Sequence, residues 1–141
     1  MKGYINRFSM DFEAKSANEG FARIAISGFA SQLDPTIDVL ADVKTAVSEA
    51  VTNSIVHAYK NMGGKIKLTA SYDEKRVLTV IVKDKGCGIE DIEKALQPLY
   101  TTDKSGERSG MGFAIMESFM DSLKVSSKPG QGTRIVMKKK L

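Results

Sequence analysis

The chain lacks the paired cysteines and long apolar runs that are typical of secreted and membrane proteins. Its 141 residues include one cysteine, one histidine and no tryptophan. A single cysteine, Cys87, excludes an internal disulfide and a zinc site built from cysteines, and it favours a reducing compartment. No apolar run approaches the roughly 20 residues of a membrane span, and residues 1–12 lack the apolar core of a signal peptide. We therefore expect a cytoplasmic protein with no membrane contact.

Net charge is modest, but its sign raises the question of nucleic-acid binding. The chain carries 21 basic and 17 acidic side chains, a formal charge of +4, and its pI is near 9.1. Such a pI suits a nucleic-acid partner. However, residues 1–83 carry 11 basic and 9 acidic groups, and residues 84–137 carry 7 and 8. The remaining charges are Lys138, Lys139 and Lys140, which we predict to be a solvated strand end, so we expect no direct contact with nucleic acid.

The first quarter of the chain predicts a strand followed by a helix. Residues 4–12 alternate apolar and polar side chains, as a half-buried strand does. Ser16 and Glu19 then have the spacing of a capping box at a helix start. Apolar residues at helical spacing continue this helix to about Leu33.

A second and longer helix is predicted between residues 34 and 59. Asp34 suits its N-cap and Pro35 its first position. About 25 residues without a breaker exceed the usual mean helix length, so this helix should form the spine of the domain. Its predicted buried stripe contains Ile37, Leu40, Val47, Val51, Ile55 and Ala58.

The second half of the chain predicts mainly strands. The strand expected over residues 76–83 is apolar on nearly both faces, which favours a central position in a sheet. With no linker long enough to separate domains, residues 1–141 are expected to form one domain. We predict an α+β fold, a two-layer α/β sandwich whose mixed, mostly antiparallel sheet has helices on one face. The other expected elements are strands at 65–72, 123–128 and 133–140 and helical segments at 89–96 and 110–121.

Two polar residues share one face of the long helix. Glu49 and Asn53 are four positions apart and therefore lie one turn from each other. An amide oxygen is a hard ligand suited to Mg²⁺, and a neighbouring carboxylate can accept a proton from a hydroxyl. Taken alone, the pair is better explained as a solvated polar face.

A second candidate follows the predicted central strand. Asp84 stands at its end and can accept a hydrogen bond from an exocyclic amine such as the adenine N6, while Gly86 and Gly88 let the backbone pass close to a flat ring. An ordinary strand-to-helix turn also uses Asp and Gly. The dinucleotide fingerprint is excluded because its glycine pattern is incomplete. We expect the intervening Cys87 to be a small packed residue.

A third candidate opens the helix predicted from residue 110. Ser109 is suited to the N-cap, and Gly110 and Gly112 remove Cβ atoms that would block a phosphate. Free N–H groups and the helix dipole make such a helix start an anion site, although glycine-rich helix starts are common. Seven of the twelve glycines lie between residues 86 and 132.

Together and in this order, the three candidates resemble the N, G1 and G2 boxes of the GHKL (Bergerat) ATPase superfamily. The resemblance narrows to one family, the anti-sigma F serine kinases of spore-forming bacteria, and covers nearly the whole chain. It implies the GHKL form of the sandwich, with ATP between the long helix and the sheet. The stretches that carry the narrower resemblance are 43–59, 98–102, 107–113 and 116–121.

The resemblance also assigns roles to individual residues. Glu49 is implied as general base and Arg108 as the group that neutralises charge on the γ-phosphoryl. Asn53 is implied to bind Mg²⁺, and Asp84, supported by Thr133, to bind the adenine amine. Gly86 and Gly88 would line the base, and residues 97–109 would form a lid. The implied phosphate contacts are Thr102, Ser109, Gly110, Met111 and Gly112.

The implied function is that of an anti-sigma factor and Mg·ATP-dependent serine kinase that releases ADP. Its implied partners are a sporulation sigma factor, which it holds inactive, and an anti-anti-sigma factor, which it phosphorylates on serine. Arg23 is implied to contact these partners. The resemblance also implies a homodimer. Alternatives are a general-stress-type anti-sigma kinase and a nucleotide-gated binding module with little turnover. A detached histidine-kinase catalytic domain is disfavoured because the one histidine, His57, lies on the nucleotide-facing helix.

Overall fold

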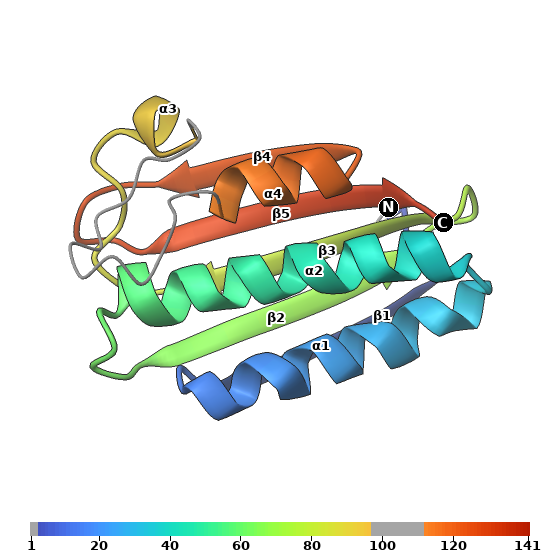
Figure 1. The fold of residues 1–141 in the computed structure, drawn as a ribbon, viewed down its shortest axis with the longest axis horizontal. Helices are drawn as coiled ribbons and strands as arrows, with labels where there is room; N and C mark the ends of the chain where they lie inside the picture. Colours follow the sequence, from blue (N-terminus) through green and yellow to red (C-terminus); the bar gives the residue numbers. More distant parts are fainter. Residues whose placement is uncertain (1–2, 97–111) are drawn as a thin grey trace.

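The computed structural model describes residues 3–96 and 112–141, which form a two-layer α/β sandwich (Figure 1). One layer is a five-stranded sheet, and helices α1, α2 and α4 lie together on one of its faces. The predicted α+β class with helices on one face is confirmed. Within the described residues, no helix is both long and apolar enough to cross a membrane. The elements are β1 (Asn6–Glu13), α1 (Ser16–Ala30), η1 (Ser31–Leu33), α2 (Ile37–Asn53), η2 (Ser54–Ala58), β2 (Lys65–Tyr72), β3 (Val77–Asp84), α3 (Ile92–Ala95), α4 (Gly112–Phe119), β4 (Ser122–Ser127) and β5 (Thr133–Lys140).

Strand β3 occupies the centre of the sheet, as its apolar sequence predicts. The strand order is β1-β2-β3-β5-β4, and all four pairings are antiparallel. The register of β3 with β5 aligns Asp84 with Thr133. Two residues that are far apart in sequence therefore meet at the end of the central strand.

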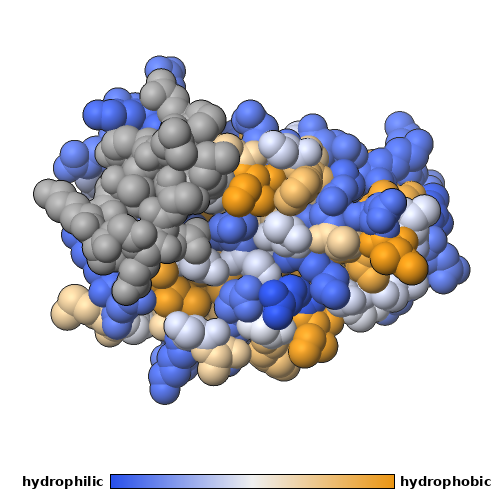
Figure 2. All heavy atoms as spheres, in the orientation of Figure 1, coloured by the Kyte–Doolittle hydropathy of each residue, from blue (hydrophilic) through white to orange (hydrophobic). Residues whose placement is uncertain are grey.

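The core lies between this sheet and the helices. Leu78, Val80 and Val82 of β3 are at most 1% exposed and belong to one apolar cluster with Ile26 of α1 and Val47 of α2. Burial of each such side chain contributes about 1.5–3 kcal/mol. The packing holds α2 along the sheet and so fixes where its polar face lies. Some apolar side chains also remain on the surface of the helical layer (Figure 2).

The face of the sheet away from the helices is rich in basic side chains. Lys67, Lys83 and Arg134 are direct cross-strand neighbours on β2, β3 and β5, and all three are exposed. Asp11 of β1 ends this row. Like charges directly opposite one another repel. The positive charge is thus spread over the open face, which corrects the expectation that it is confined to the C-terminal lysines.

Helix α2 begins two residues later than predicted. Its N-cap is Thr36, whose hydroxyl accepts a hydrogen bond from the N–H of Val39 at 3.2 Å. Asp34 instead adopts a left-handed conformation with φ +50°, so the prediction of Asp34 as N-cap was wrong. Ile37 now begins the helix and is 86% exposed, which removes it from the predicted buried stripe.

Helix α1 also starts without the predicted capping box. Ser16 is its first helical residue, and the N-cap is Lys15, whose side chain makes no capping hydrogen bond. The connection to β1 is held instead by the side-chain amide of Asn18, which donates to the carbonyl oxygen of Glu13 at 2.9 Å. The side chain of Asn18 therefore ties the start of α1 to the preceding strand, although no side chain caps the helix.

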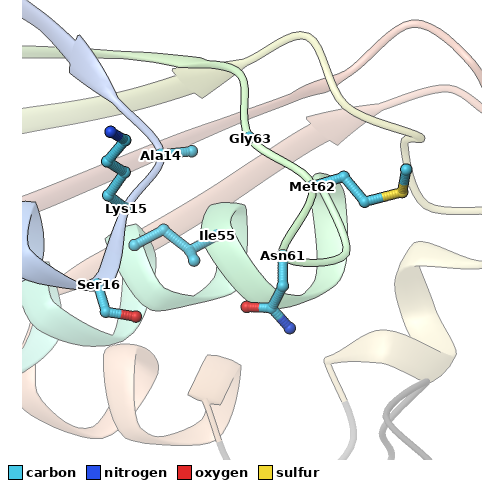
Figure 3. A pocket seen from close by; sticks show the side chains of 7 residues that line it. All are labelled: Ala14, Lys15, Ser16, Ile55, Asn61, Met62 and Gly63. Carbon is cyan, nitrogen blue, oxygen red and sulfur yellow. The ribbon is translucent and has the colours of Figure 1, made fainter.

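An open pocket of about 470 Å³ lies beside the end of α2, next to the connection between β1 and α1 (Figure 3). None of the residues predicted to bind nucleotide lines it. The lining residues are Ala14, Lys15, Ser16, Ile55, Asn61, Met62 and Gly63.

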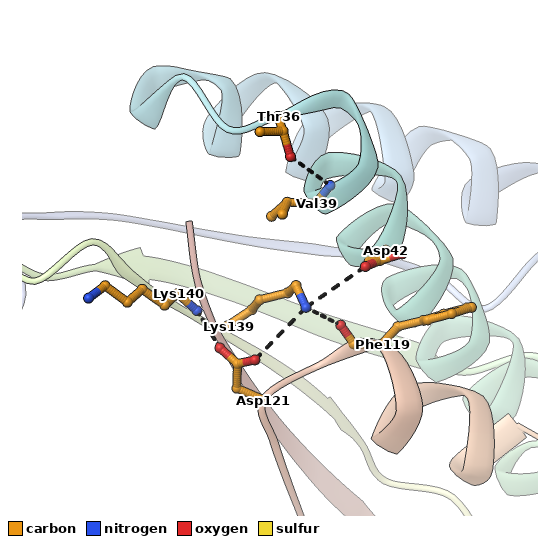
Figure 4. Close-up of polar contacts among 7 residues, drawn as sticks. All are labelled: Thr36, Val39, Asp42, Phe119, Asp121, Lys139 and Lys140. Atoms are coloured by element: carbon orange, nitrogen blue, oxygen red, sulfur yellow. Dashed lines mark hydrogen bonds and ion pairs between the residues drawn. The ribbon is translucent and has the colours of Figure 1, made fainter.

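Lys139 fastens the C-terminal end of α4 to α2 (Figure 4). Its ammonium group donates to the carbonyl oxygen of Phe119 at 2.6 Å and lies 3.9 Å from the carboxylates of Asp42 and Asp121. The Lys139 side chain is only 13% exposed. The prediction that all three C-terminal lysines are solvated is therefore wrong for this one, because alternate residues of β5 face the helices.

Candidate functional site

Several segments meet at the end of the sandwich where β3 finishes. They are the end of α2, the loop after β3, the start of α4 and the turn between β4 and β5 (Figure 1). Hydrogen bonds join some of these segments directly: Asp84 bonds to Ser54 and to Thr133, and the N–H of Gly130 donates to the carbonyl oxygen of Cys87 at 2.6 Å. The end of α2 with the segment that follows it, the loop after β3 and the turn between β4 and β5 are therefore joined at one place.

The polar face of α2 points toward α4. Asp42, Glu49 and Asn53 are separated by seven and four residues, so they share one face of the helix. Asp42 marks that face, because it lies beside Lys139 at the C-terminal end of α4. The eight residues of α4 span about 12 Å and run back along α2 (Figure 1). The N-terminal residue of α4, Gly112, is therefore about level with Glu49.

Asp84 is the best-defined polar side chain of this region. Its residue is 3% exposed, and three donors surround its carboxylate. Oδ1 accepts from the N–H groups of Gly86 at 2.9 Å and Thr133 at 3.1 Å, and Oδ2 accepts from the hydroxyl of Ser54 at 2.8 Å. A carboxylate can accept about four hydrogen bonds. Three protein donors therefore leave Asp84 able to accept about one more.

Burial and hydrogen bonding act in opposite directions on this carboxyl group. Burial raises the pKa of Asp84 above its ordinary value of 3.8, because it penalises the charged form. The hydrogen bonds from Gly86, Ser54 and Thr133 lower the pKa and partly offset that effect. All three partners are uncharged, so the charged form is held by hydrogen bonds and not by an ion pair.

A π-helical segment at the end of α2 places Ser54. In η2, the N–H of Tyr59 donates to the carbonyl oxygen of Ser54 at 3.0 Å, five residues back. Such π-helical segments are rare overall, but those that do occur are frequently found at functional sites. Ser54 is completely buried against Asp84. The segment thereby links the helix to the end of β3.

The same segment anchors the loop that follows β3. The carbonyl oxygen of Ala58 accepts from the N–H of Cys87 at 2.9 Å. The hydroxyl of Tyr59 donates to the carbonyl oxygen of Lys65 at 2.6 Å and accepts from the N–H of Lys85 at 2.7 Å. These contacts fix the loop backbone on both sides of Gly86.

Two glycines of this loop are required by the packing of the chain itself. A Cβ atom on Gly86 would overlap the carbonyl group of Ala58. Gly88 has φ +77°, and a Cβ atom there would overlap the carbonyl oxygen of Lys128. Close approach of protein backbone already accounts for both glycines, in keeping with the alternative of an ordinary turn. Their contact with a base stays a prediction.

A second hydroxyl lies under the loop on the side of β4. The Ser127 hydroxyl donates to the carbonyl oxygen of Gly132 at 2.8 Å, accepts from the N–H of Ile89 at 2.9 Å and lies 2.9 Å from the Thr133 hydroxyl. Thr133 therefore supports Asp84 directly through its backbone, while its side chain contacts Ser127. The resemblance implied that Thr133 supports Asp84 either directly or through water, and the contact present is direct.

The sequence analysis missed Ser54 and Ser127. A signal for Ser54 exists, because it stands seven residues after Val47 and four after Ala50, in the buried stripe of the helix. A polar residue in such a stripe needs a buried partner. Ser127 carries no comparable signal, since its role depends on how β4 pairs with β5.

The exposure of Cys87 differs from the prediction that it is a small packed residue. The residue is exposed, and its thiol contacts the carbonyl oxygens of His57 and Gly88, each at 3.4 Å. The two flanking glycines pack inward, so the side chain between them points to the surface.

The predicted site residues divide into three groups. Arg23 lies apart on α1, where its guanidinium is 3.3 Å from Glu19 and 3.5 Å from the hydroxyl of Ser48. Thr102, Arg108, Ser109, Gly110 and Met111, together with the whole of the expected lid, lie outside the described residues. The residues at the end of β3 are Asp84, Gly86, Gly88 and Thr133. Asn53 directly precedes Ser54, which contacts Asp84, while Glu49 lies one turn earlier on α2 and Gly112 begins α4.

Within residues 3–96 and 112–141, no cluster of three or more His, Cys, Asp or Glu side chains could hold a metal ion. A divalent ion at Asn53 would therefore need most of its ligands from elsewhere, such as water and phosphate oxygens.

Comparison with known proteins agrees with this geometry. The family model for the histidine kinase-like ATPase domain matches residues 12–139. The chain is 57% identical over 136 residues to the anti-sigma F factor of Clostridium kluyveri, with 96% of this chain and 95% of that protein covered. It is 56% identical over 135 residues to the anti-sigma F factor of Clostridium acetobutylicum, with 96% and 94% covered.

A solved structure shows the same fold at much lower identity. The Mycobacterium tuberculosis protein with RsbU and RsbW domains superposes with a TM-score of 0.69 and 16% identity. The match covers 97% of this chain and 32% of that one.

Proposed function

We propose a function for this chain on one premise: it belongs to the anti-sigma F factor family, and its domain is of the histidine kinase-like ATPase type. The protein binds a sporulation sigma factor and holds it inactive. It also uses Mg·ATP to phosphorylate a serine of an anti-anti-sigma antagonist, releasing ADP. The observation that carries the proposal is the buried Asp84 carboxylate with one acceptor position left, at the end of the sheet where α2 and α4 meet.

Asp84 fits the amino group of adenine. A buried carboxylate is costly unless hydrogen bonds compensate it, and three of its acceptor positions are already used by Gly86, Thr133 and Ser54. The remaining position accepts an N–H donor and repels a carbonyl oxygen. Gly86 and Gly88 present backbone without side chains beside it. These features support a purine with an exocyclic amine as the bound base.

The polar face of α2 and the start of α4 fit the phosphate end of the nucleotide. When bound, ATP supplies the phosphoryl group and Mg²⁺ offsets its charge. Asn53 offers an amide oxygen to the ion. The N–H groups at the start of α4, from Gly112, offer hydrogen bonds and the positive end of a helix dipole.

Glu49 holds the position of a general base. It lies one turn before Asn53 on the face of α2 that points toward α4, so a serine hydroxyl brought to the phosphate end would meet its carboxylate. Arg108 keeps its proposed role in neutralising charge on the phosphoryl group. Proposed phosphate contacts outside the described residues are Thr102, Ser109, Gly110 and Met111.

The partner surface is proposed to include the exposed side of α1. Arg23 is flanked there by Phe21 and Ile24, which are 55% and 71% exposed. Apolar side chains beside an exposed arginine are typical of the centre of a protein interface. We propose that sigma factor and antagonist both use this surface, and that the active protein is a cytoplasmic homodimer that does not contact nucleic acid or membrane.

Phosphoryl transfer to a defined antagonist tests the proposal. The chain is mixed with Mg·ATP and its anti-anti-sigma protein, and phosphoserine is measured by mass spectrometry. Glu49→Ala is expected to slow transfer at least about 100-fold while nucleotide and sigma-factor binding persist. Asn53→Ala should lose both transfer and nucleotide-dependent binding.

Two outcomes would overturn parts of the proposal. A Glu49→Ala protein that phosphorylates the antagonist at the wild-type rate excludes Glu49 as the base. Nucleotide-dependent sigma binding by the wild type without any phosphoserine would favour the alternative function, a nucleotide-gated binding module with little turnover.

A further inference from the structure

We propose that Ser54 is a positioning residue for base recognition: its buried hydroxyl fills one of the two acceptor positions on Oδ2 of Asp84, so that the position left on this oxygen selects a 6-amino purine over a 6-oxo purine. The inference rests on the proposed nucleotide function and assigns a role to a residue outside the predicted site. It follows from the geometry of the three donors around the carboxylate.

The three donors do not act on Asp84 in the same way. Gly86 and Thr133 both donate to Oδ1, at 2.9 and 3.1 Å. Ser54 alone donates to Oδ2, at 2.8 Å. Two donors fill both lone pairs of Oδ1, so the free acceptor position lies on Oδ2. The Ser54 hydroxyl takes one lone pair of Oδ2 and so determines which one is left for a ligand.

Ser54 is held rigidly enough to do this. The residue is 0% exposed, and it starts the π-helical segment, where its own N–H donates to the carbonyl oxygens of Ala50 and Val51. A serine within a helix commonly returns its hydroxyl to a carbonyl oxygen of the preceding turn. Here the hydroxyl instead crosses to β3, and so ties the helix to Asp84.

The bond also determines what the carboxylate can recognise. A hydroxyl that donates to Oδ2 favours the ionised form of Asp84, which accepts hydrogen bonds and donates none. An amino group at position 6 of a purine then finds an oriented acceptor. A carbonyl oxygen at that position would face a lone pair. Without Ser54, Oδ2 can take up a proton, and a protonated carboxyl can donate to the carbonyl oxygen.

Paired nucleotide affinities test this role. Dissociation constants for Mg·ATP and Mg·ITP, which differ in the group at position 6, are measured by calorimetry for wild type, Ser54→Ala and Ser54→Thr. The wild type should prefer ATP by about tenfold or more, as a hydrogen bond to a charged group implies. Ser54→Ala should lower this preference at least about fivefold, mainly by weakening ATP. Ser54→Thr, which keeps the hydroxyl, should restore it.

Controls separate positioning from a general loss of structure. Thr45→Ala removes a hydroxyl from an exposed position of the same helix and should leave the preference unchanged. If Ser54→Ala does not fold, Ser54→Cys, which keeps a similar volume with a weak donor, takes its place. Equal weakening of ATP and ITP, or an unchanged preference in a folded variant, overturns the inference. Failure of the wild type to bind either nucleotide overturns the proposed function itself.

Discussion

The carboxylate of Asp84 accepts a hydrogen bond from the main-chain N–H of Thr133 at 3.1 Å, although 49 residues separate the two in sequence. The contact exists because β5 returns to pair with β3 and aligns these residues. The proposed base site therefore depends on the sheet order, and it is complete only when the last strand has docked.

Replacing Asp84 by asparagine should impair adenine recognition. The side-chain NH₂ group cannot accept a hydrogen bond, so one of the present donors or the base amine loses its partner. We expect ATP affinity to fall about 10- to 100-fold, which corresponds to about 1.5–3 kcal/mol, as measured by calorimetry. Asp11→Asn, on the exposed open face, should bind ATP as the wild type does. Equal affinities for both variants would exclude Asp84 from the base site.

ATP affinity should also weaken on acidification at a higher pH than an ordinary aspartate would cause. Burial raises the pKa of Asp84 above 3.8, so the acceptor becomes protonated as pH falls through that raised value. The effect on folding has the opposite sign. A carboxyl whose pKa is raised on folding contributes stability that is present below its unfolded pKa and lost as pH rises through its folded pKa.

Affinity measured over a pH series in wild type and Asp84→Asn separates this titration from that of the nucleotide. The difference between the two proteins should shrink as pH falls. A wild-type advantage that stays constant down to the ordinary aspartate value of 3.8 would contradict the assignment.

Two glycines with the same backbone conformation should respond differently to alanine. Gly88 and Gly130 both have φ +77°, but only Gly88 would place a Cβ atom against the carbonyl oxygen of Lys128. We expect Gly130→Ala to lower the free energy of unfolding by about 1–2 kcal/mol, the cost of the left-handed conformation. Gly88→Ala should cost about 3 kcal/mol or more. Urea unfolding measures both, and similar losses would mean that the hairpin can move away at little cost.

Neighbouring lysines of β5 should likewise differ in their contribution to stability. Lys139 is 13% exposed and bonds to the carbonyl oxygen of Phe119, while Lys138 is exposed on the open face. Lys139→Met should lower the free energy of unfolding by about 1–3 kcal/mol, because the end of α4 loses its charged donor. Lys138→Met should change it by less than about 0.5 kcal/mol. Thermal unfolding of the two variants provides the comparison.

Arg23 is expected to affect partner binding without affecting the fold. Its ion pair with Glu19 is an exposed pair within one helix, which contributes at most about 0.5 kcal/mol. Arg23→Ala should weaken sigma-factor binding about tenfold or more, as central interface arginines do, while ATP affinity stays at the wild-type value. Glu19→Ala controls for loss of the pair alone. If Arg23→Ala and Glu19→Ala weaken sigma-factor binding equally, the ion pair and not the arginine itself is responsible.

Much of the fold could be predicted because its apolar periods are regular. The alternation in residues 4–12 and the apolar run of β3 gave the strands and the central position correctly. Helix starts were less predictable, because Asp34 and Thr36 are both good N-caps. The chain resolves that choice by placing Asp34 in a left-handed turn, which depends on how α1 and α2 pack.

The site was predictable where a motif is local and not where it is assembled. Glu49, Asn53 and Asp84 are candidates because of their spacing and their place at the end of a strand, and their roles stay predictions. Ser54 depends on a π-helical segment, which a helical period of 3.6 residues does not reveal. Ser127 depends on strand pairing across the β4–β5 hairpin. The exposure of Cys87 depends on two glycines that pack inward against distant carbonyl groups.

The contacts that Lys139 makes with Phe119, Asp42 and Asp121 affect how α4 can move. Lys139 bonds to the carbonyl oxygen of Phe119, the last residue of α4, and lies beside Asp42 of α2. Because this end of the helix is held and the other is not held by this side chain, we expect any movement of α4 to be larger at Gly112 than at Phe119. Asp42 on α2 and Asp121 after α4, each 3.9 Å from the Lys139 ammonium group, would keep the held end in place.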